Sequence, residues 1–90
     1  MAQVRQGVDT TDASLIKLMA TRYAYMEAAA RIKTDRSAVR DEARKAVVID
    51  NAASLAESFG MPSEDIRSIW DQLVESSIAY ELSKWEKEHT

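Results

Sequence analysis

Residues 3–34 read QVRQGVDTTDASLIKLMATRYAYMEAAARIKT, without proline and with one glycine near the beginning. Side chains at three- and four-residue steps form a continuous seam, which is typical of an amphipathic helix. The seam residues are Val4, Val8, Thr11, Leu15, Leu18, Arg22, Met26 and Ala29. Such a helix is a rod roughly 45 Å long, whereas a compact globule of this size has a radius of gyration of about 12 Å. We expect the rod to project from a monomer and to pack along a second copy.

The segment Phe59-Gly60-Met61-Pro62-Ser63 combines the only proline with one of the two glycines. It predicts the end of a helix, a turn and a new helix whose N-cap is Ser63. Apart from residues 34–37, the remaining sequence is rich in good helix formers. We therefore predict an all-α fold, with helices at about residues 3–34, 39–59 and 63–87 in a single domain over residues 1–90.

The second and third predicted helices each carry an apolar face. In the second helix the face comprises Val39, Ala43, Ala46, Val47, Ala53 and Ala56 and ends at Phe59. In the third it comprises Ile66, Ile69, Trp70, Leu73, Ile78, Leu82 and Trp85. We interpret the aromatic residues as packing residues with a polar tip, namely Trp70, Trp85, Tyr23, Tyr25 and Tyr80.

Composition excludes several kinds of site. There is no cysteine, which removes thiol nucleophiles and thiolate metal sites and fits a reducing compartment. The only histidine is His89, next to the last residue. The sequence therefore argues against a Ser-His-Asp relay and against a multi-histidine metal site. Two glycines do not make a glycine-rich phosphate loop. We expect neither a metal nor a cofactor.

The net charge is −3, but its distribution is uneven. Residues 1–40 carry seven Lys/Arg against four Asp/Glu, and residues 41–90 carry five against eleven. This split argues against nucleic-acid binding and leaves room for a local cationic site. The sequence has no apolar run long enough for a membrane span and no apolar signal-peptide core. We therefore expect no membrane partner and a cytoplasmic location.

Three cations of the first predicted helix occupy informative positions. Arg22 interrupts the apolar seam, and either snorkels to the surface or meets a buried carboxylate across a dimer. Lys33 lies only about 20° around the helix from Arg22, so a small dianion can lie between them, or Lys33 is simply solvated near the helix end. Arg5 lies about 25 Å from Arg22 along the helix. It can serve the same pocket only from another subunit; otherwise it is an ordinary exposed arginine.

Two further pairs lie on the other predicted helices. Asp41 and Arg44 are three residues apart, a spacing at which a carboxylate can hold a guanidinium. Ser77 and Glu81 continue an apolar line of the third helix, so both are predicted to point inward. A structural hydrogen-bond network explains that second pair as well as a binding site does.

Together these residues resemble the all-helical, AroQ-type chorismate mutases, a family that includes the isochorismate-pyruvate lyases. The resemblance runs through VRQGVDTTD at residues 4–12, LIKLMATR at 15–22, ARIK at 30–33, VRDEAR at 39–44 and SIAYE at 77–81. It implies an intertwined three-helix homodimer with two equivalent pockets. Each implied pocket takes Arg5 from one chain and, from the other, Arg22, Lys33, Asp41, Arg44, Ser77 and Glu81.

The activity implied by the resemblance is the rearrangement of chorismate to prephenate, in aromatic amino acid biosynthesis from the shikimate pathway. This intramolecular reaction of a dicarboxylate needs no nucleophile, metal or redox cofactor. Catalysis reduces to holding the compact conformer and stabilising the charge that grows on the breaking ether oxygen. The implied roles are carboxylate binding by Arg5 and Arg22, supported by Ser77, substrate positioning by Arg44, contact with the ring hydroxyl by Asp41, and contact with the ether oxygen by Lys33 and Glu81.

Two positions differ from the common family pattern. Many bacterial members carry glutamine where Glu81 stands, and an ionised carboxylate there repels a developing oxyanion. We therefore expect Glu81 to work in its protonated form. Lys45 replaces a glutamate of well-known mutases that lyase-type relatives also lack, whereas Asp41 matches the mutases.

These features leave two alternatives to a chorismate mutase. One is an isochorismate-pyruvate lyase that forms salicylate and pyruvate. The other is a catalytically silent helical dimer that senses an aromatic metabolite or binds a partner protein.

Overall fold

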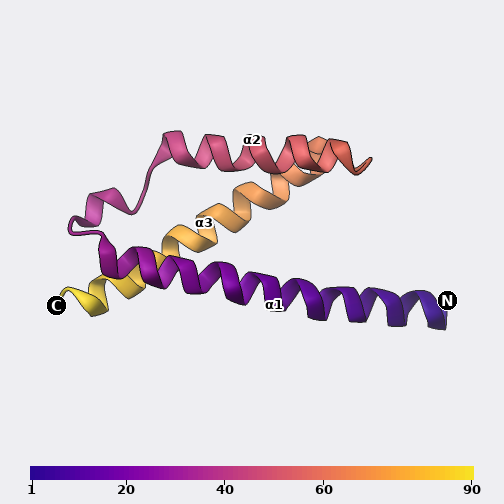
Figure 1. Cartoon of the computed structure of the whole chain (residues 1–90), viewed down its shortest axis with the longest axis horizontal. Coiled ribbons are helices and arrows are strands. Elements are labelled where there is room, and N and C mark those ends of the chain that lie inside the picture. Colours follow the sequence, from indigo (N-terminus) through magenta and orange to yellow (C-terminus); the bar gives the residue numbers. More distant parts are fainter.

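A computed structural model describes residues 1–90. The chain forms three α helices and one short 3₁₀ helix, without a strand (Figure 1). Helix α1 spans Ala2–Ile32, η1 spans Arg36–Ala38, α2 spans Glu42–Ser58 and α3 spans Ser63–Glu88. The predicted all-helical fold with three helices is confirmed. None of these helices has both the length and the apolar composition needed to cross a membrane.

The second helix begins three residues later than predicted because Asp41 is its N-cap. The Asp41 side chain accepts a hydrogen bond from the backbone N–H of Arg44, at 2.9 Å, which ties down one of the free amides of the first turn. Val39 therefore lies in the segment that joins α1 to α2, residues 33–41. The predicted apolar face from Val39 through Ala43 to Val47 is not a face of α2. The side of α2 that is partly or fully buried carries Lys45, Val48, Ile49, Ala52, Ala53 and Ala56.

The turn between α2 and α3 lies where it was predicted, but the N-cap of α3 is a different residue. Gly60 adopts a φ of 73°, the left-handed conformation that glycine accommodates best. Its N–H donates to the carbonyl of Glu57, and the N–H of Met61 donates to that of Ala56, which is the Schellman pattern. Pro62, not Ser63, occupies the N-cap of α3 and makes no side-chain cap. The prediction of Ser63 as N-cap was therefore wrong by one residue.

Helix α3 lies between the other two helices and packs against both, whereas no Cα atom of α1 lies within 8 Å of one of α2 (Figure 1). A small core forms where the connection meets α3, around Val39, Val74 and Ile78. Only nine of the 90 residues are buried, so the single chain encloses little apolar surface for its size.

Polar contacts also join α1 to α3, on the side away from this core. The Tyr80 hydroxyl donates to Glu27, and the Lys84 ammonium lies 3.4 Å from the same carboxylate. The rings of Tyr23 and Tyr80 lie 4.8 Å apart. These contacts hold the C-terminal half of α1 against α3, and the hydrogen bond from Tyr80, together with Lys84, keeps the pKa of Glu27 below its ordinary value.

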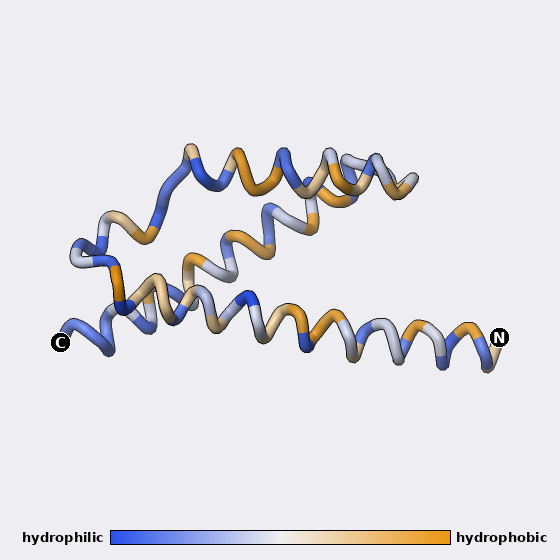
Figure 2. The backbone as a smooth tube through the Cα atoms, viewed as in Figure 1, coloured by the Kyte–Doolittle hydropathy of each residue, from blue (hydrophilic) through white to orange (hydrophobic).

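The N-terminal part of α1 projects beyond the rest of the chain, as predicted. All of its first 20 residues are exposed, and the chain measures 51 × 25 × 15 Å with a radius of gyration of 15.6 Å. A compact chain of this length is expected near 12 Å. Apolar residues recur along the projecting rod (Figure 2), and one of them, Leu18, is 67% exposed.

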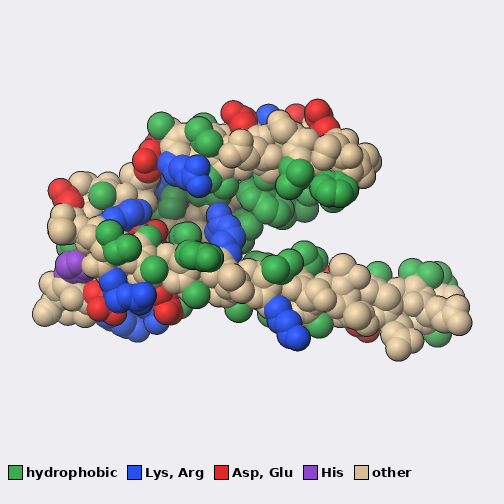
Figure 3. Space-filling model, in the orientation of Figure 1, with side chains coloured by type: hydrophobic (Ala, Val, Ile, Leu, Met, Phe, Trp, Pro, Cys, Tyr) green, Lys and Arg blue, Asp and Glu red, His purple; other side chains and the backbone are tan.

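An apolar groove of about 660 Å³ separates this rod from the C-terminal part of α2 and the N-terminal part of α3. Hydrophobic side chains gather on the facing surfaces across the opening (Figure 3). The walls include Leu15 and Met19 of α1, Leu55 of α2 and Trp70 of α3. Five residues of the predicted apolar faces are exposed in the single chain, namely Ala43, Ala46, Val47, Phe59 and Ile69. Phe59 and Ile69 line this groove, so they lack packing partners within the chain.

Candidate active site

A second, polar cavity of about 520 Å³ lies where α1, α2 and α3 converge. Half of its lining residues are hydrophobic, and its polar lining consists of Arg22, Lys33, Asp41, Arg44, Lys45, Ser77 and Glu81. Six of the seven predicted site residues thus lie around one cavity, although they come from distant parts of the sequence. The seventh, Arg5, lies on the projecting rod and does not line it.

Arg22 points toward α3 and contacts Ser77. One guanidinium nitrogen of Arg22 donates to the Ser77 hydroxyl, which in turn donates to the backbone carbonyl of Leu73 at 2.7 Å. Ser77 is 3% exposed, so its predicted inward position is confirmed. Because the hydroxyl proton is used by Leu73, the Ser77 oxygen acts as an acceptor and fixes the direction of the guanidinium.

Lys33 and Glu81 form an ion pair at one wall of the cavity. The ammonium of Lys33 lies 2.8 Å from Oε2 of Glu81, which is 4% exposed. Lys33 is the C-cap of α1, and its backbone carbonyl accepts a hydrogen bond from the Trp85 indole at 3.0 Å. Trp85, which we interpreted only as a packing residue, therefore also anchors Lys33.

The second oxygen of Glu81 remains available to a ligand. Every fully buried side-chain nitrogen or oxygen in the chain has a hydrogen-bond partner. Oε1 of Glu81 has no partner within the chain, so it is not fully buried and reaches the cavity that Glu81 lines. A ligand there meets a carboxyl oxygen directly beside an ammonium group.

Asp41 and Arg44 do not form the ion pair that their spacing suggested. Oδ1 of Asp41 binds the backbone N–H of Arg44 instead of its guanidinium. The predicted side-chain pair was therefore wrong, because capping α2 satisfies the carboxylate locally. The consequence is that the Arg44 guanidinium remains free at the cavity.

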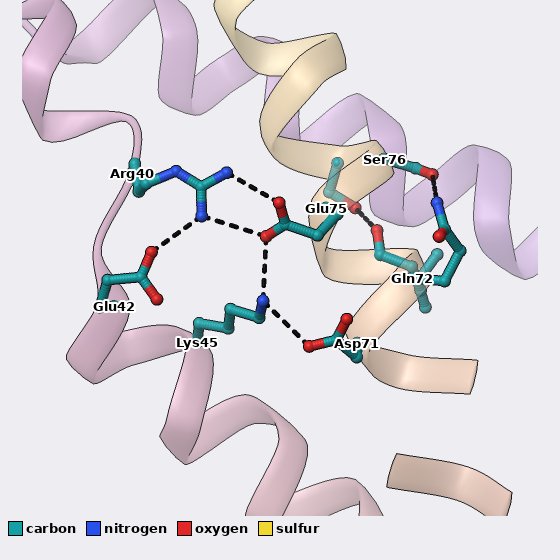
Figure 4. Close-up of polar contacts among 9 residues, drawn as sticks. Arg40, Glu42, Lys45, Asp71, Gln72, Glu75 and Ser76 are labelled. Atoms are coloured by element: carbon teal, nitrogen blue, oxygen red, sulfur yellow. Dashed lines mark hydrogen bonds and ion pairs between the residues drawn. The ribbon is translucent and has the colours of Figure 1, made fainter. Parts of the chain in front are cut away.

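Lys45 is a cavity residue whose environment was not predicted. Its ammonium lies 3.0 Å from both Asp71 and Glu75, two carboxylates of α3 outside the cavity lining (Figure 4). The contact with Asp71, followed by that with Glu75, raises the pKa of Lys45. A sequence signal for this cluster exists, since Asp71 and Glu75 are like charges at i,i+4, a spacing that is destabilising unless a cation intervenes.

The lining therefore carries an excess of positive charge. It contains four cations against two carboxylates. Lys33 and Lys45 are paired, whereas Arg22 and Arg44 take part in none of the chain's ion pairs. Guanidinium groups bind carboxylates through two parallel hydrogen bonds. The four cations against two carboxylates leave a net charge of +2 around the cavity, which suits a small dicarboxylate.

No group of three or more His, Cys, Asp and Glu side chains is arranged to hold a metal ion. The polar groups of the cavity are instead donors suited to anions, plus one carboxyl group beside an ammonium.

Comparison with known proteins agrees with this geometry. The chain is 25% identical to the isochorismate pyruvate lyase of Pseudomonas aeruginosa over 85 residues, which cover 94% of this chain and 84% of that protein. Residues 4–82 match the family described as chorismate mutase type II. Since that match covers most of the sequence, including every residue of the cavity, the chain belongs to the type II chorismate mutase family.

Proposed function

We propose that the protein is a chorismate mutase that converts chorismate to prephenate. The observation that carries the proposal is the pair of arginines, Arg22 of α1 and Arg44 of α2, which face one cavity without a carboxylate partner in the chain. Chorismate carries two carboxylates, which match this charge excess. Family membership supports the same class of substrate.

The reaction needs only atoms of the substrate. One carbon–carbon bond forms and one ether carbon–oxygen bond breaks within a single molecule. The protein accelerates it by holding the compact conformer in which the reacting carbons are close. It also stabilises negative charge that develops on the ether oxygen.

In the proposed mechanism Lys33 and Glu81 act at the ether oxygen. Their contact at 2.8 Å places an ammonium and a carboxyl group side by side at the cavity. Lys33 stabilises the developing oxyanion by its charge. Glu81 donates a hydrogen bond when it is protonated and opposes the reaction when it is ionised.

The remaining residues bind the ground state in this proposal. Arg22, supported by Ser77, binds one carboxylate, and Arg44 positions the substrate. Asp41 uses one oxygen to cap α2 and offers the other to the ring hydroxyl. The substrate is thus held by groups from all three helices.

We further propose that the active form is an intertwined homodimer. The projecting rod of one copy would cover the apolar groove of the other, and Arg5 of that rod would bind the second carboxylate. The unfilled groove of about 660 Å³ and the full exposure of the first 20 residues support this assembly. In it, residues 1–90 act as one domain.

The second candidate is an isochorismate-pyruvate lyase. It is favoured by the name of the Pseudomonas aeruginosa relative and by Lys45, which stands where well-known mutases carry glutamate. Asp41 favours the mutase, because lyase-type relatives are apolar there. Both reactions use a similar dicarboxylate in the same cavity.

Turnover of chorismate and isochorismate by the purified protein tests the proposal. We expect loss of chorismate absorbance with formation of prephenate, and a higher kcat/KM for chorismate than for isochorismate. Arg22→Ala should lower kcat/KM by roughly a hundredfold or more, because it removes a charged hydrogen-bond donor from the site. Arg31→Ala, an exposed arginine of the same helix, serves as the matched control and should retain activity.

Three results would contradict the proposal in different ways. Preference for isochorismate identifies the lyase. Tight binding of chorismate without turnover identifies a metabolite sensor. Equal activity of Arg22→Ala and Arg31→Ala places the chemistry elsewhere in the molecule.

A further inference from the structure

A network of five charged side chains joins the beginning of α2 to the middle of α3 (Figure 4). Glu75 of α3 is its centre. Both terminal nitrogens of Arg40 contact the Glu75 carboxylate, at 3.1 and 2.8 Å, and the Lys45 ammonium contacts it at 3.0 Å. Glu42 contacts Arg40 at 2.8 Å, and Asp71 contacts Lys45 at 3.0 Å.

The two cations held by Glu75 flank the residues that reach the cavity. Arg40 immediately precedes Asp41, and Lys45 immediately follows Arg44. Glu75 itself does not line the cavity. The Glu75 carboxylate thus binds the cationic side chains that stand immediately before Asp41 and immediately after Arg44.

Apolar and ionic contacts together fix this end of α2. No Cα atom of α2 lies within 8 Å of one of α1, so the first turn of α2 is located mainly by α3 and by the segment that joins α1 to α2. Val39, together with Val48 and Ile49 of α2, packs against α3 in the small core and supplies the apolar part of that attachment. Glu75 adjoins Val74 in sequence and supplies the ionic part.

We infer that Glu75 is a positioning residue that holds Asp41 and Arg44 at the cavity by binding Arg40 and Lys45. This inference rests on the proposed function for its effect on catalysis, and on the contacts alone for its effect on structure. Glu75 thus acts on the site through Arg40 and Lys45 without lining the cavity itself.

The network has the features that distinguish effective surface ion pairs from weak ones. Isolated exposed pairs contribute little, whereas two-pronged arginine–carboxylate contacts within a network contribute more. Contacts from Arg40 and then Lys45 lower the pKa of Glu75 to about 2, so the carboxylate is ionised at neutral pH. The like charges of Asp71 and Glu75 also make release of Lys45 unfavourable.

The test compares Glu75→Gln, which keeps the shape and removes the charge, with Asp50→Asn. Asp50 of α2 pairs with Arg67 of α3 at 2.8 Å, so the control also removes one ion pair between the same helices, but away from the cavity. We expect Glu75→Gln to raise KM about fivefold and to change kcat less than about twofold, because Lys33 and Glu81 are untouched. Asp50→Asn should leave both constants at the wild-type values.

Two further measurements separate positioning from general destabilisation. Arg40→Met removes the Arg40–Glu75 contact and leaves Lys45 on Glu75, so it should produce part of the rise in KM. The double variant should be no worse than Glu75→Gln alone, since Glu75→Gln already breaks the contact with Arg40. Amide hydrogen exchange should become faster over residues 39–45 in Glu75→Gln and not in Asp50→Asn.

Additive effects, an unchanged KM, or unchanged exchange over residues 39–45 would overturn the inference. If Glu75→Gln does not fold, Arg40→Met alone must show a rise in KM and faster exchange over residues 39–45. Exchange requires no substrate, so it decides the structural role even if the wild-type protein turns over neither chorismate nor isochorismate. In that event the proposed function fails independently.

Discussion

At the level of single residues, the contact of Glu81 with Lys33 and the proposed role of Glu81 require opposite protonation states. It is almost completely buried and lies 2.8 Å from Lys33, a contact suited to an ionised carboxylate. The proposed reaction needs the opposite state, because a negative charge beside the ether oxygen repels the charge that develops there. The proton on Glu81 is therefore expected to control activity.

Replacing Glu81 by glutamine tests this directly. In the wild-type protein kcat/KM should fall as pH rises and Glu81 loses its proton, whereas Glu81→Gln should keep its activity because the amide donates at every pH. The measurement is a pH profile of kcat/KM for both proteins, with Glu86→Gln as an exposed control. Identical profiles for wild type and Glu81→Gln would reject the protonated role.

Glu75 gives a second prediction at this scale, concerning stability in acid. Its pKa falls from an ordinary 4.5 to about 2 because Arg40, and then Lys45, bind the ionised form. A lowered pKa in the folded state means that the stabilisation is complete above about pH 4.5 and is lost as pH falls toward 2. The free energy of unfolding of wild type should therefore exceed that of Glu75→Gln at pH 6, and the difference should shrink in acid.

Urea denaturation of both proteins between about pH 2 and 6 measures this difference. Asp35 also has a pKa below its ordinary value, because the backbone N–H and the hydroxyl of Ser37 bind it. It contributes equally to both proteins and cancels. A gap between the two proteins that does not vary with pH would show that Glu75 acts by shape rather than by charge.

At the level of elements, the sequence predicted the helices better than their ends. Three- and four-residue periodicity and the Gly60–Pro62 turn were sufficient for the number and order of helices. The beginning of α2 was missed because an aspartate within a helix-forming run looks the same whether it caps or continues the helix. Only the hydrogen bond that the Arg44 backbone N–H donates to the Asp41 carboxylate distinguishes the two cases.

The cavity depends both on how each helix is rotated about its own axis and on how the helices pack, and periodicity in the sequence indicates only the first. The inward position of Ser77 and Glu81 follows from rotation within one helix, which periodicity reveals, and both are buried. The partners of Lys45 depend on how α2 is rotated against α3. That relation is set by packing between helices, so the sequence indicated only that Asp71 and Glu75 needed a cation.

Asp41 caps α2 with one oxygen and, in the proposed function, binds the ring hydroxyl with the other. Two substitutions should therefore separate its effect on stability from its effect on binding. Asp41→Ala should cost about 1 kcal/mol of unfolding free energy, since it removes the cap, whereas Asp41→Asn should preserve stability because asparagine caps equally well. Asparagine has a single acceptor oxygen, and capping uses it. Both variants should therefore lose the acceptor for the ring hydroxyl, with about a tenfold fall in kcat/KM.

Thermal or urea unfolding together with steady-state kinetics on both variants provides the comparison. Equal destabilisation by Asp41→Ala and Asp41→Asn would contradict the capping role. Full activity of Asp41→Asn would instead remove Asp41 from substrate recognition and weaken the preference for the mutase over the lyase.

At the level of the whole molecule, the single chain is incomplete in two respects. Its rod and groove leave large apolar surfaces uncovered, and extensive exposed apolar patches mark sites of association. Arg5 is also too far along α1 to line the chain's own cavity. A second copy arranged by two-fold symmetry would cover the apolar surfaces, because each rod would fill the other copy's groove, and it would bring Arg5 to the other copy's cavity.

Complementation between two inactive variants tests this assembly. Arg5→Ala and Arg22→Ala homodimers should each have both pockets damaged. In a mixed dimer, one pocket receives Arg22 from the first variant and Arg5 from the second and is intact, while the other pocket lacks both. Unfolding the two variants together and refolding them in equal amounts should give half mixed dimers, and hence about a quarter of wild-type activity.

The recovered activity distinguishes the possible roles of Arg5. If Arg5 served its own chain, mixed dimers would contain no intact pocket and co-refolding would restore nothing. If Arg5 had no role, the Arg5→Ala homodimer would be active before mixing. Refolding each variant alone controls for the treatment, and sedimentation at the assay concentration verifies that dimers form. Recovery on mixing, from two inactive proteins, therefore requires one pocket to be built from two chains.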